Sequence, residues 1–326
     1  MTEVGATGAP PGTAPVLIAY DGSTHAERAI QAAAALLPGR PALVLTVWRS
    51  VRRAAVSSRL ALPYDVVQGG VAALDAEARD EAKRLAEDGA RLAREGGLRA
   101  DAETAECERS TAATIAAVAD AHDTAVVVVG SRGHSAVRST FLGSVTYGLL
   151  HATRHPVLVV RDDPTADARA FEGPVMLCYD GSAPARHAAE VAGGLLDGSR
   201  ALVVHAWEPV EDRLLRPAAY APLAPQLADV AAELDAADRA EAETVAAEGA
   251  EVARAAGFEA TSRIVDERQG TWECLDGAAE EEDARLVVAG SRGRSSLASL
   301  VIGSVSHGLL HHSSRPLLIV PPQSPQ

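Results

Sequence analysis

The chain has 326 residues, of which 47% are apolar but only 3% aromatic, and its formal net charge is −14. Lys83 is the only lysine, so no G-K-[ST] motif exists and a P-loop nucleotide site is excluded. The negative charge argues against nucleic-acid binding, because the surface would repel phosphates, and no apolar run is long enough to span a membrane.

The first half of the sequence alternates predicted strands and helices. Short apolar runs, mostly rich in β-branched residues, predict strands at 16–20, 42–48, 125–130 and 156–160. A further strand with a weaker pattern is expected near 99–105. Apolar residues at helical spacing predict helices near 24–37, 71–95 and 111–121. Ser23 or Thr24 is the expected cap of the first helix, and residues 49–70 are expected to form a long loop.

The second half repeats the same order. Strands are predicted at 175–179, 201–207, 259–264, 285–289 and 316–320. Helices are predicted at 184–196, 227–256 and 271–280, with a second long loop at 208–226. Strictly alternating strands and helices indicate a parallel sheet with right-handed crossovers in each half.

Two sequence blocks show that a whole domain has been duplicated. VLIAYDGS at 16–23 recurs as VMLCYDGS at 175–182, and the 31 residues from Gly130 recur from Gly290 with about half of the positions identical. The separation along the sequence between the two copies is nearly the same for both blocks. We therefore expect a flexible tail at 1–14, a first domain at 15–161, a polar linker at 162–172 and a second domain at 173–322.

The residues that carry chemistry follow predicted strands in both copies. Asp21 and Asp180 come directly after the first strand of each copy. A glycine set follows the fourth strand: Gly130, Gly133 and, after nine residues, Gly143-Ser144, with a twin at Gly290, Gly293 and Gly303-Ser304. In open α/β sheets, ligands bind beyond the carboxyl ends of the strands, where the winding direction reverses.

This spacing suits an anion site built from backbone groups. The first two glycines let bare backbone approach a sugar or a phosphate, and the Gly-Ser pair opens a helix whose free N–H groups attract anions. Turn glycines and a capping serine also occur for purely structural reasons. The same spacing in two copies with altered intervening residues favours the anion site. Arg132 and Arg292 beside the glycines are expected either to reach a phosphate or to be solvated.

The glycine pattern G-x-x-G-x9-G-[ST], the DGS after the first strand and the closing H-P-V-L-V-V resemble the ATP-binding branch of the universal stress protein family, over about 16–161 and 175–321. The resemblance implies two tandem Rossmann-like (adenine nucleotide α hydrolase-like) domains. Each would be a five-stranded parallel sheet of order 3-2-1-4-5 flanked by helices. ATP, with or without Mg²⁺, would bind between strands 1 and 4.

The resemblance also implies the residues of each site. In the first copy they are Ala19, Asp21, Val47, Gly130, Arg132, Gly133, Gly143, Ser144 and Val145. In the second copy they are Cys178, Asp180, Ala206, Gly290, Arg292, Gly293, Gly303, Ser304 and Val305. Ala206 is smaller than Val47, so the second pocket is expected to hold adenine less snugly. Trp48 and Trp207 are expected to fill the core or to wall the pocket.

These observations predict a cytosolic stress-response regulator that binds an adenine nucleotide in each domain. The three separated cysteines suit a reducing compartment, and neither a membrane nor a nucleic acid is expected as a partner. The final strands, 156–160 and 316–320, are expected to pair within the chain, and homodimerisation stays open. Three alternatives also stay open: a slow ATPase, a cyclic-AMP-binding module and a nucleotide-free scaffold. No catalytic or metal-binding residue is predicted.

Overall fold

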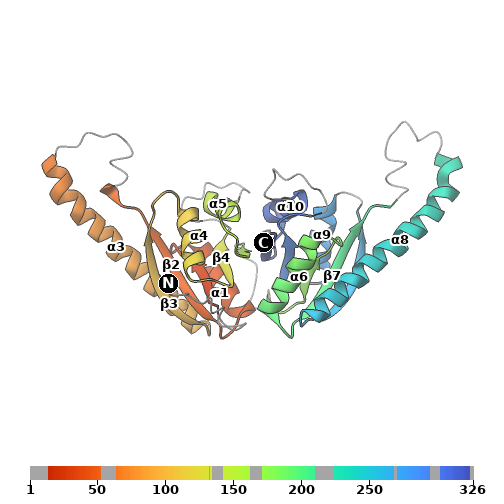
Figure 1. The fold of residues 1–326 in the computed structure, drawn as a ribbon, viewed down its shortest axis with the longest axis horizontal. Helices are drawn as coiled ribbons and strands as arrows, with labels where there is room; N and C mark the ends of the chain where they lie inside the picture. Colours follow the sequence, from red (N-terminus) through yellow and green to blue (C-terminus); the bar gives the residue numbers. More distant parts are fainter. Residues whose placement is uncertain are drawn as a thin grey trace, which may run out of the picture. The chain divides into compact units, whose positions relative to one another are not determined.

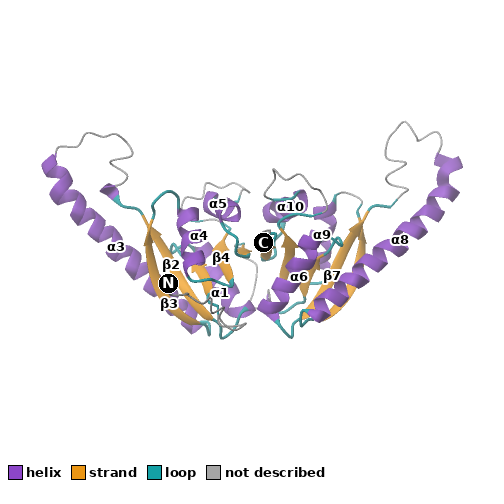
Figure 2. Cartoon of the chain, viewed as in Figure 1, coloured by secondary structure: helices purple, strands orange, loops and turns teal. Residues whose placement is uncertain are grey.

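The computed structural model describes residues 14–52, 64–131, 133, 142–161, 171–209, 224–267, 270–293 and 302–323. The chain divides near residue 162 into two compact units (Figure 1). Each unit combines strands and helices in alternation (Figure 2). No helix among the described residues combines the length and the apolar character needed to cross a membrane.

The first unit is a parallel sheet flanked by helices. Its strands are β1 (Val16–Ala19), β2 (Pro41–Trp48), β3 (Arg99–Glu106), β4 (Val126–Gly130) and β5 (Val157–Val160). Its described helices are α1 (Thr24–Leu36), α3 (Tyr64–Glu95), α4 (Thr111–Ala121) and α5 (Ser144–Ala152). The strand order is β3-β2-β1-β4-β5, which confirms the predicted order.

The reversal of winding lies between β1 and β4. Val16 is in register with Ala42 of β2 on one side and with Val126 of β4 on the other. Right-handed crossovers that run in opposite directions from this point place their helices on opposite faces of the sheet. Accordingly, α1 packs against α3, and α4 packs against α5.

The second unit repeats this arrangement. Its strands are β6 (Val175–Cys178), β7 (Arg200–Trp207), β8 (Glu259–Asp266), β9 (Leu286–Gly290) and β10 (Leu317–Val320). Its described helices are α6 (Ala183–Leu196), α8 (Ala224–Ala255), α9 (Thr271–Glu281) and α10 (Ser304–His312). Within this unit the order is β8-β7-β6-β9-β10, the counterpart of the first sheet.

The core explains why the central strands read as unbroken apolar runs. Every residue of β5 and β10 is buried, as are nearly all residues of β1, β4, β6 and β9, because helices cover both faces of the sheet. Alanines on the helices let them approach the sheet closely. Gly89 of α3 comes so near that an added Cβ would lie 2.7 Å from the ring of Tyr20.

Helix α3 is longer than the sequence predicts. It begins at Tyr64, inside the loop expected at 49–70, and α8 begins at Ala224, inside the loop expected at 208–226. Gly69 and Gly70 argue locally for a loop, because each costs a helix about 1 kcal/mol relative to alanine. Helix propagation is cooperative, so a long helix tolerates such residues. Both predicted loops are therefore shorter than expected.

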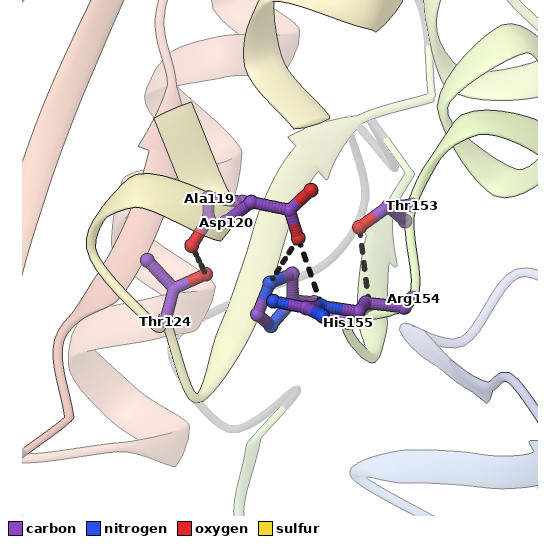
Figure 3. A network of polar contacts seen from close by, with 6 residues as sticks. All are labelled: Ala119, Asp120, Thr124, Thr153, Arg154 and His155. Atoms are coloured by element: carbon purple, nitrogen blue, oxygen red, sulfur yellow. Dashed lines mark hydrogen bonds and ion pairs between the residues drawn. The ribbon is translucent and has the colours of Figure 1, made fainter. Parts of the chain in front are cut away.

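A polar network joins the end of α4 to the segment that leads into β5 (Figure 3). Nε2 of the buried His155 and Nε of Arg154 both lie 3.0 Å from Oδ1 of Asp120. The backbone N–H of His155 donates to Oγ1 of Thr153 at 3.0 Å. These contacts hold α4 over the sheet, with its N-terminus at the edge where β4 ends.

We predict that two adjacent glycines of α6 respond oppositely to alanine. A Cβ on Gly193 would collide with the carbonyl oxygen of Ala256 and lie 2.6 Å from its Cβ, whereas a Cβ on Gly194 meets no atom within 4 Å. Gly193→Ala should lower Tm by roughly 3–10 °C through overpacking. Gly194→Ala should leave Tm unchanged or raise it by about 1–3 °C through helix propensity.

Thermal unfolding followed by circular dichroism measures both variants, and each serves as the control for the other. Equal shifts in Tm would show that α6 and the end of α8 are not in close contact.

Candidate functional site

The first unit contains a cavity of about 420 Å³ at the carboxyl edge of its sheet. Its walls come from the ends of β1, β2 and β4 and from the first turns of α1, α4 and α5. This is the position where the winding direction reverses, and it is the expected place for a ligand in a sheet of this kind.

Asp21 links this edge to α1. Its Oδ1 accepts hydrogen bonds from the N–H of Ser23 at 3.1 Å and from the Ser23 hydroxyl at 2.6 Å. The Ser23 hydroxyl in turn accepts from the N–H of Ala26 at 3.2 Å and caps the helix. The other oxygen, Oδ2, faces Gly133, where an added Cβ would lie only 2.6 Å away. A side chain at position 133 would therefore crowd the carboxylate.

The glycine segment is held to the end of β4 by backbone hydrogen bonds. The N–H of Ser131 donates to Val160 at 2.7 Å, and the N–H of Gly143 donates to the carbonyl of Ser131 at 2.8 Å. The Thr146 hydroxyl donates to the carbonyl of Gly130 at 2.9 Å. Together these bonds fix the N-terminus of α5 beside the end of β4.

The N-terminus of α5 presents unsatisfied N–H groups to the cavity. Gly143 is the N-cap residue and supplies no side-chain hydrogen bond. The first N–H groups of a helix have no carbonyl partner within the helix, and the helix dipole makes this end attractive to anions. Ser144, Val145 and Thr146 all line the cavity. The arrangement is suited to holding phosphate oxygens.

The second unit builds an equivalent cavity of about 260 Å³. The N–H of Gly303 donates to Ser291 at 2.7 Å, and the Ser306 hydroxyl donates to the carbonyl of Gly290 at 2.6 Å. Oδ1 of Asp180 accepts from the N–H of Ser182 at 3.0 Å. Arg292 lines this cavity, and its buried Nε has no hydrogen-bond partner among the described residues.

The second cavity is the smaller of the two, although Ala206 is smaller than Val47. The looser hold on adenine around Ala206 stays a prediction. His205 lines the second cavity, and its Nδ1 lies 2.8 Å from the carbonyl oxygen of Tyr179. The corresponding Thr46 makes the same kind of bond, to Tyr20 at 3.0 Å, but does not line the first cavity.

The sequence-predicted site residues come together in these two cavities. The first is lined by Ala19, Asp21, Val47, Gly130, Gly133, Gly143, Ser144 and Val145, while Arg132 lies outside the described residues. The second is lined by Cys178, Asp180, Ala206, Gly290, Arg292, Gly293, Gly303, Ser304 and Val305. Trp48 is buried, its ring lies 5.2 Å from the guanidinium of Arg79, and it lines neither cavity. The Nε1–H of Trp207 donates to Asp266 at 3.1 Å.

The sequence analysis missed the contribution of α4 in the first unit and of α9 in the second. Thr111 and Ile115 of α4 line the first cavity, and Thr271 and Leu275 of α9 line the second. Each pair is spaced by four residues and therefore lies on one helix face. That spacing, present in both copies, is the signal that was available. Arg49, which also lines the first cavity, had no such signal.

Burial makes the thiol of Cys178 a weaker acid than a solvated cysteine. Desolvation, helped by the nearby Cys274, Asp180 and Asp276, raises the pKa of Cys178 to about 12. Burial also raises the pKa of Tyr179 to about 12, and its hydroxyl donates to Glu248 at 3.1 Å. The wall of the second cavity therefore stays neutral at Cys178 at physiological pH.

Residues 13–161 and 173–321 each match the universal stress protein family. The chain is 28% identical over 252 residues to a universal stress protein of Mycobacterium tuberculosis, covering 74% of this chain and 76% of the relative. It is 34% identical over 148 residues to one from Thermus aquaticus, covering 45% of this chain and 96% of the relative. The crystal structure of a universal stress protein from Archaeoglobus fulgidus aligns with a TM-score of 0.62 at 19% identity. That alignment covers 95% of this chain and 99% of the other.

We predict that Cys178 reacts slowly with iodoacetamide in the folded protein. With its pKa raised to about 12, the reactive thiolate is only about one part in a thousand at pH 9. Peptide mass spectrometry should show labelling at least about a hundredfold slower than in the same chain unfolded in urea. Similar rates in the folded and unfolded chains would contradict the burial of this thiol.

Proposed function

Because this chain belongs to the universal stress protein family, we propose that each of its two units binds ATP and that nucleotide occupancy regulates the protein. One observation carries the proposal. In both units, a cavity at the carboxyl edge of the sheet is closed by bare glycine backbone and by a helix N-terminus without a side-chain cap. Backbone N–H groups at such an end bind phosphate without a lysine.

The cavity spans the distance that a nucleotide needs. In the first unit it runs from the end of β2, across β1, to the end of β4 and the start of α5. Neighbouring strands lie about 4.8 Å apart, so this path covers roughly 10 Å. With phosphates at α5, the ribose lies over Asp21 and the base lies near the apolar side chains of Leu45, Val47 and Ile115. In the second unit, the unpartnered Nε of Arg292 supports a phosphate at the corresponding end.

The same geometry supports binding more than rapid hydrolysis. Asp21 is the carboxylate that lines the first cavity, and its Oδ1 already accepts two hydrogen bonds from Ser23. A dedicated hydrolase needs a group that is free to orient or deprotonate the attacking water. We therefore propose a regulator whose ATP turnover is slow. We also propose the cytosol as its compartment, because free thiols such as its three unpaired cysteines persist there.

We predict that valine at the two helix caps abolishes ATP binding without unfolding the protein. Gly143 has φ −63° and ψ 146°, and Gly303 has φ −71° and ψ 162°, which any L-residue adopts. A Cβ at Gly303 would lie 3.6 Å from its nearest neighbour, an ordinary contact. Isothermal titration with ATP and Mg²⁺ should show two sites per chain, reduced to one by Gly143→Val or Gly303→Val and to none by both.

Gly194→Ala is the control, since it adds a Cβ to an open helix surface away from both cavities. Parallel titrations with cyclic AMP and a phosphate-release assay separate the other possibilities. Tighter binding of cyclic AMP than of ATP would favour a cyclic-nucleotide module, and fast phosphate release lost in Asp21→Ala would favour an ATPase. If a folded, nucleotide-free sample binds none of these ligands, the glycines serve only to form turns. The chain would then be a nucleotide-free scaffold.

A further inference from the structure

The two units differ in charge at the residue that follows the tryptophan at the end of their second strand. Val47 and Arg49 both line the first cavity. The corresponding residues on either side of Trp207 are Ala206, which lines the second cavity, and Glu208, which is not among its lining residues. The residue after the tryptophan thus changes from a cation in the first unit to an anion in the second. Arg49 is exposed and makes no hydrogen bond or ion pair within the described residues. Its charge is therefore available to a ligand.

The backbone that carries Arg49 is fixed by Asp75 of α3. The hydroxyl of the buried Ser50 donates to Oδ2 of Asp75 at 2.8 Å, and the N–H of Val51 donates to Oδ1 at 2.6 Å. Desolvation opposes ionisation of this half-buried carboxyl, but the hydrogen bonds from Ser50, Val51 and the Arg52 backbone, together with the Arg52 charge, outweigh it and lower its pKa. Asp75 is therefore ionised at neutral pH and holds the chain directly after Arg49 against α3.

The second unit lacks the hydroxyl half of this link, although Asp235 stands at the position of Asp75 in the sequence. Pro209 stands where the first unit has Ser50, and proline has neither a hydroxyl nor a backbone N–H to donate. A further carboxylate also lies near the second cavity. Asp276 of α9 is close enough to Cys178, which lines the cavity, to act on its ionisation, whereas the first unit has Ala116 at the matching position. Arg292 does not make the charge of the second site different from that of the first, because Arg132 is its counterpart in the sequence.

We propose that Arg49 determines the charge selectivity of the first site, with Asp75 as its positioning residue, so that the first site binds ATP more tightly than the second. The proposal rests on the proposed nucleotide function. Its physical basis is the Coulomb interaction between a rim charge and the phosphates, which grows with the number of phosphates and is screened by salt. Adenosine carries no charge and serves as the reference ligand.

Charge reversal in single-site chains tests this proposal. A chain with Gly303→Val isolates the first site, and a chain with Gly143→Val isolates the second. At low ionic strength, Arg49→Glu should weaken ATP binding at the first site about tenfold, and Glu208→Arg should strengthen it at the second by a similar factor. Both effects should shrink to about two- to threefold in 0.5 M NaCl and be near zero for adenosine.

Arg84→Glu is the matched control. Arg84 lies on the exposed surface of α3, with 67% of its side chain accessible, and the substitution changes the net charge by the same amount. It should leave ATP affinity unchanged at both sites. An equal loss for Arg84→Glu and Arg49→Glu would show a general charge effect and would overturn the role of Arg49 at the rim.

The role of Asp75 is tested through Arg49. Asp75→Ala should reduce the preference of the first site for ATP over adenosine about threefold, and it should have no further effect in a chain that already carries Arg49→Glu. A structural role alone would weaken ATP and adenosine equally in both backgrounds, which would overturn the positioning role.

The remaining outcomes separate the two proposals. If neither single-site chain binds ATP although both are folded, the proposed function itself fails. If both bind ATP equally and neither reversal changes the affinity, nucleotide binding stands and the charge selectivity of Arg49 is wrong.

Discussion

The site depends on the pairing of β1 with β4. These strands are far apart in the sequence, yet Val16 is in register with Val126, and the crossovers on either side of this pair run in opposite directions. Helices leaving the two strands therefore diverge to opposite faces, and the carboxyl edge between them stays open. Asp21 follows one strand and the glycine segment follows the other. The second unit repeats the pairing with β6 and β9, and its cavity opens at the same place.

Backbone groups define the geometry of both sites, and a few short side chains hold that backbone in place. Thr146 and Ser306 each donate a hydroxyl hydrogen bond to the glycine carbonyl at the end of the preceding strand, Gly130 or Gly290. The N–H of Gly143 and that of Gly303 each donate to the serine after that glycine. Because these bonds need only a hydroxyl and bare backbone, the residues between the glycines can change, as His134 and Arg294 illustrate, while the geometry is kept.

The sequence predicted those parts of the fold that local patterns determine. Runs such as AVVVVG give buried strands, and the alternation of strands with helices gives a parallel sheet, but the order 3-2-1-4-5 came only from the family resemblance. Local signals failed at the start of α3, where two glycines lie inside a cooperative helix. They also could not predict the bond between Ser50 and Asp75, because these residues lie 25 positions apart and meet only when α3 packs beside the end of β2.

Duplication within one chain gives two sites that share one backbone geometry but differ in the charge of nearby side chains. The backbone at the N-termini of α5 and α10 is alike in both units, with Gly143 and Gly303 in nearly the same conformation. The residues at the end of the second strand have diverged in charge, from Arg49 to Glu208, and in size, from Thr46 to His205. A rim charge changes affinity without changing the bound geometry, since it acts through space. Under the proposed function, two sites of one design but unequal affinity would fill at different nucleotide concentrations, and the occupancy of the chain would change over a wider range than one site allows.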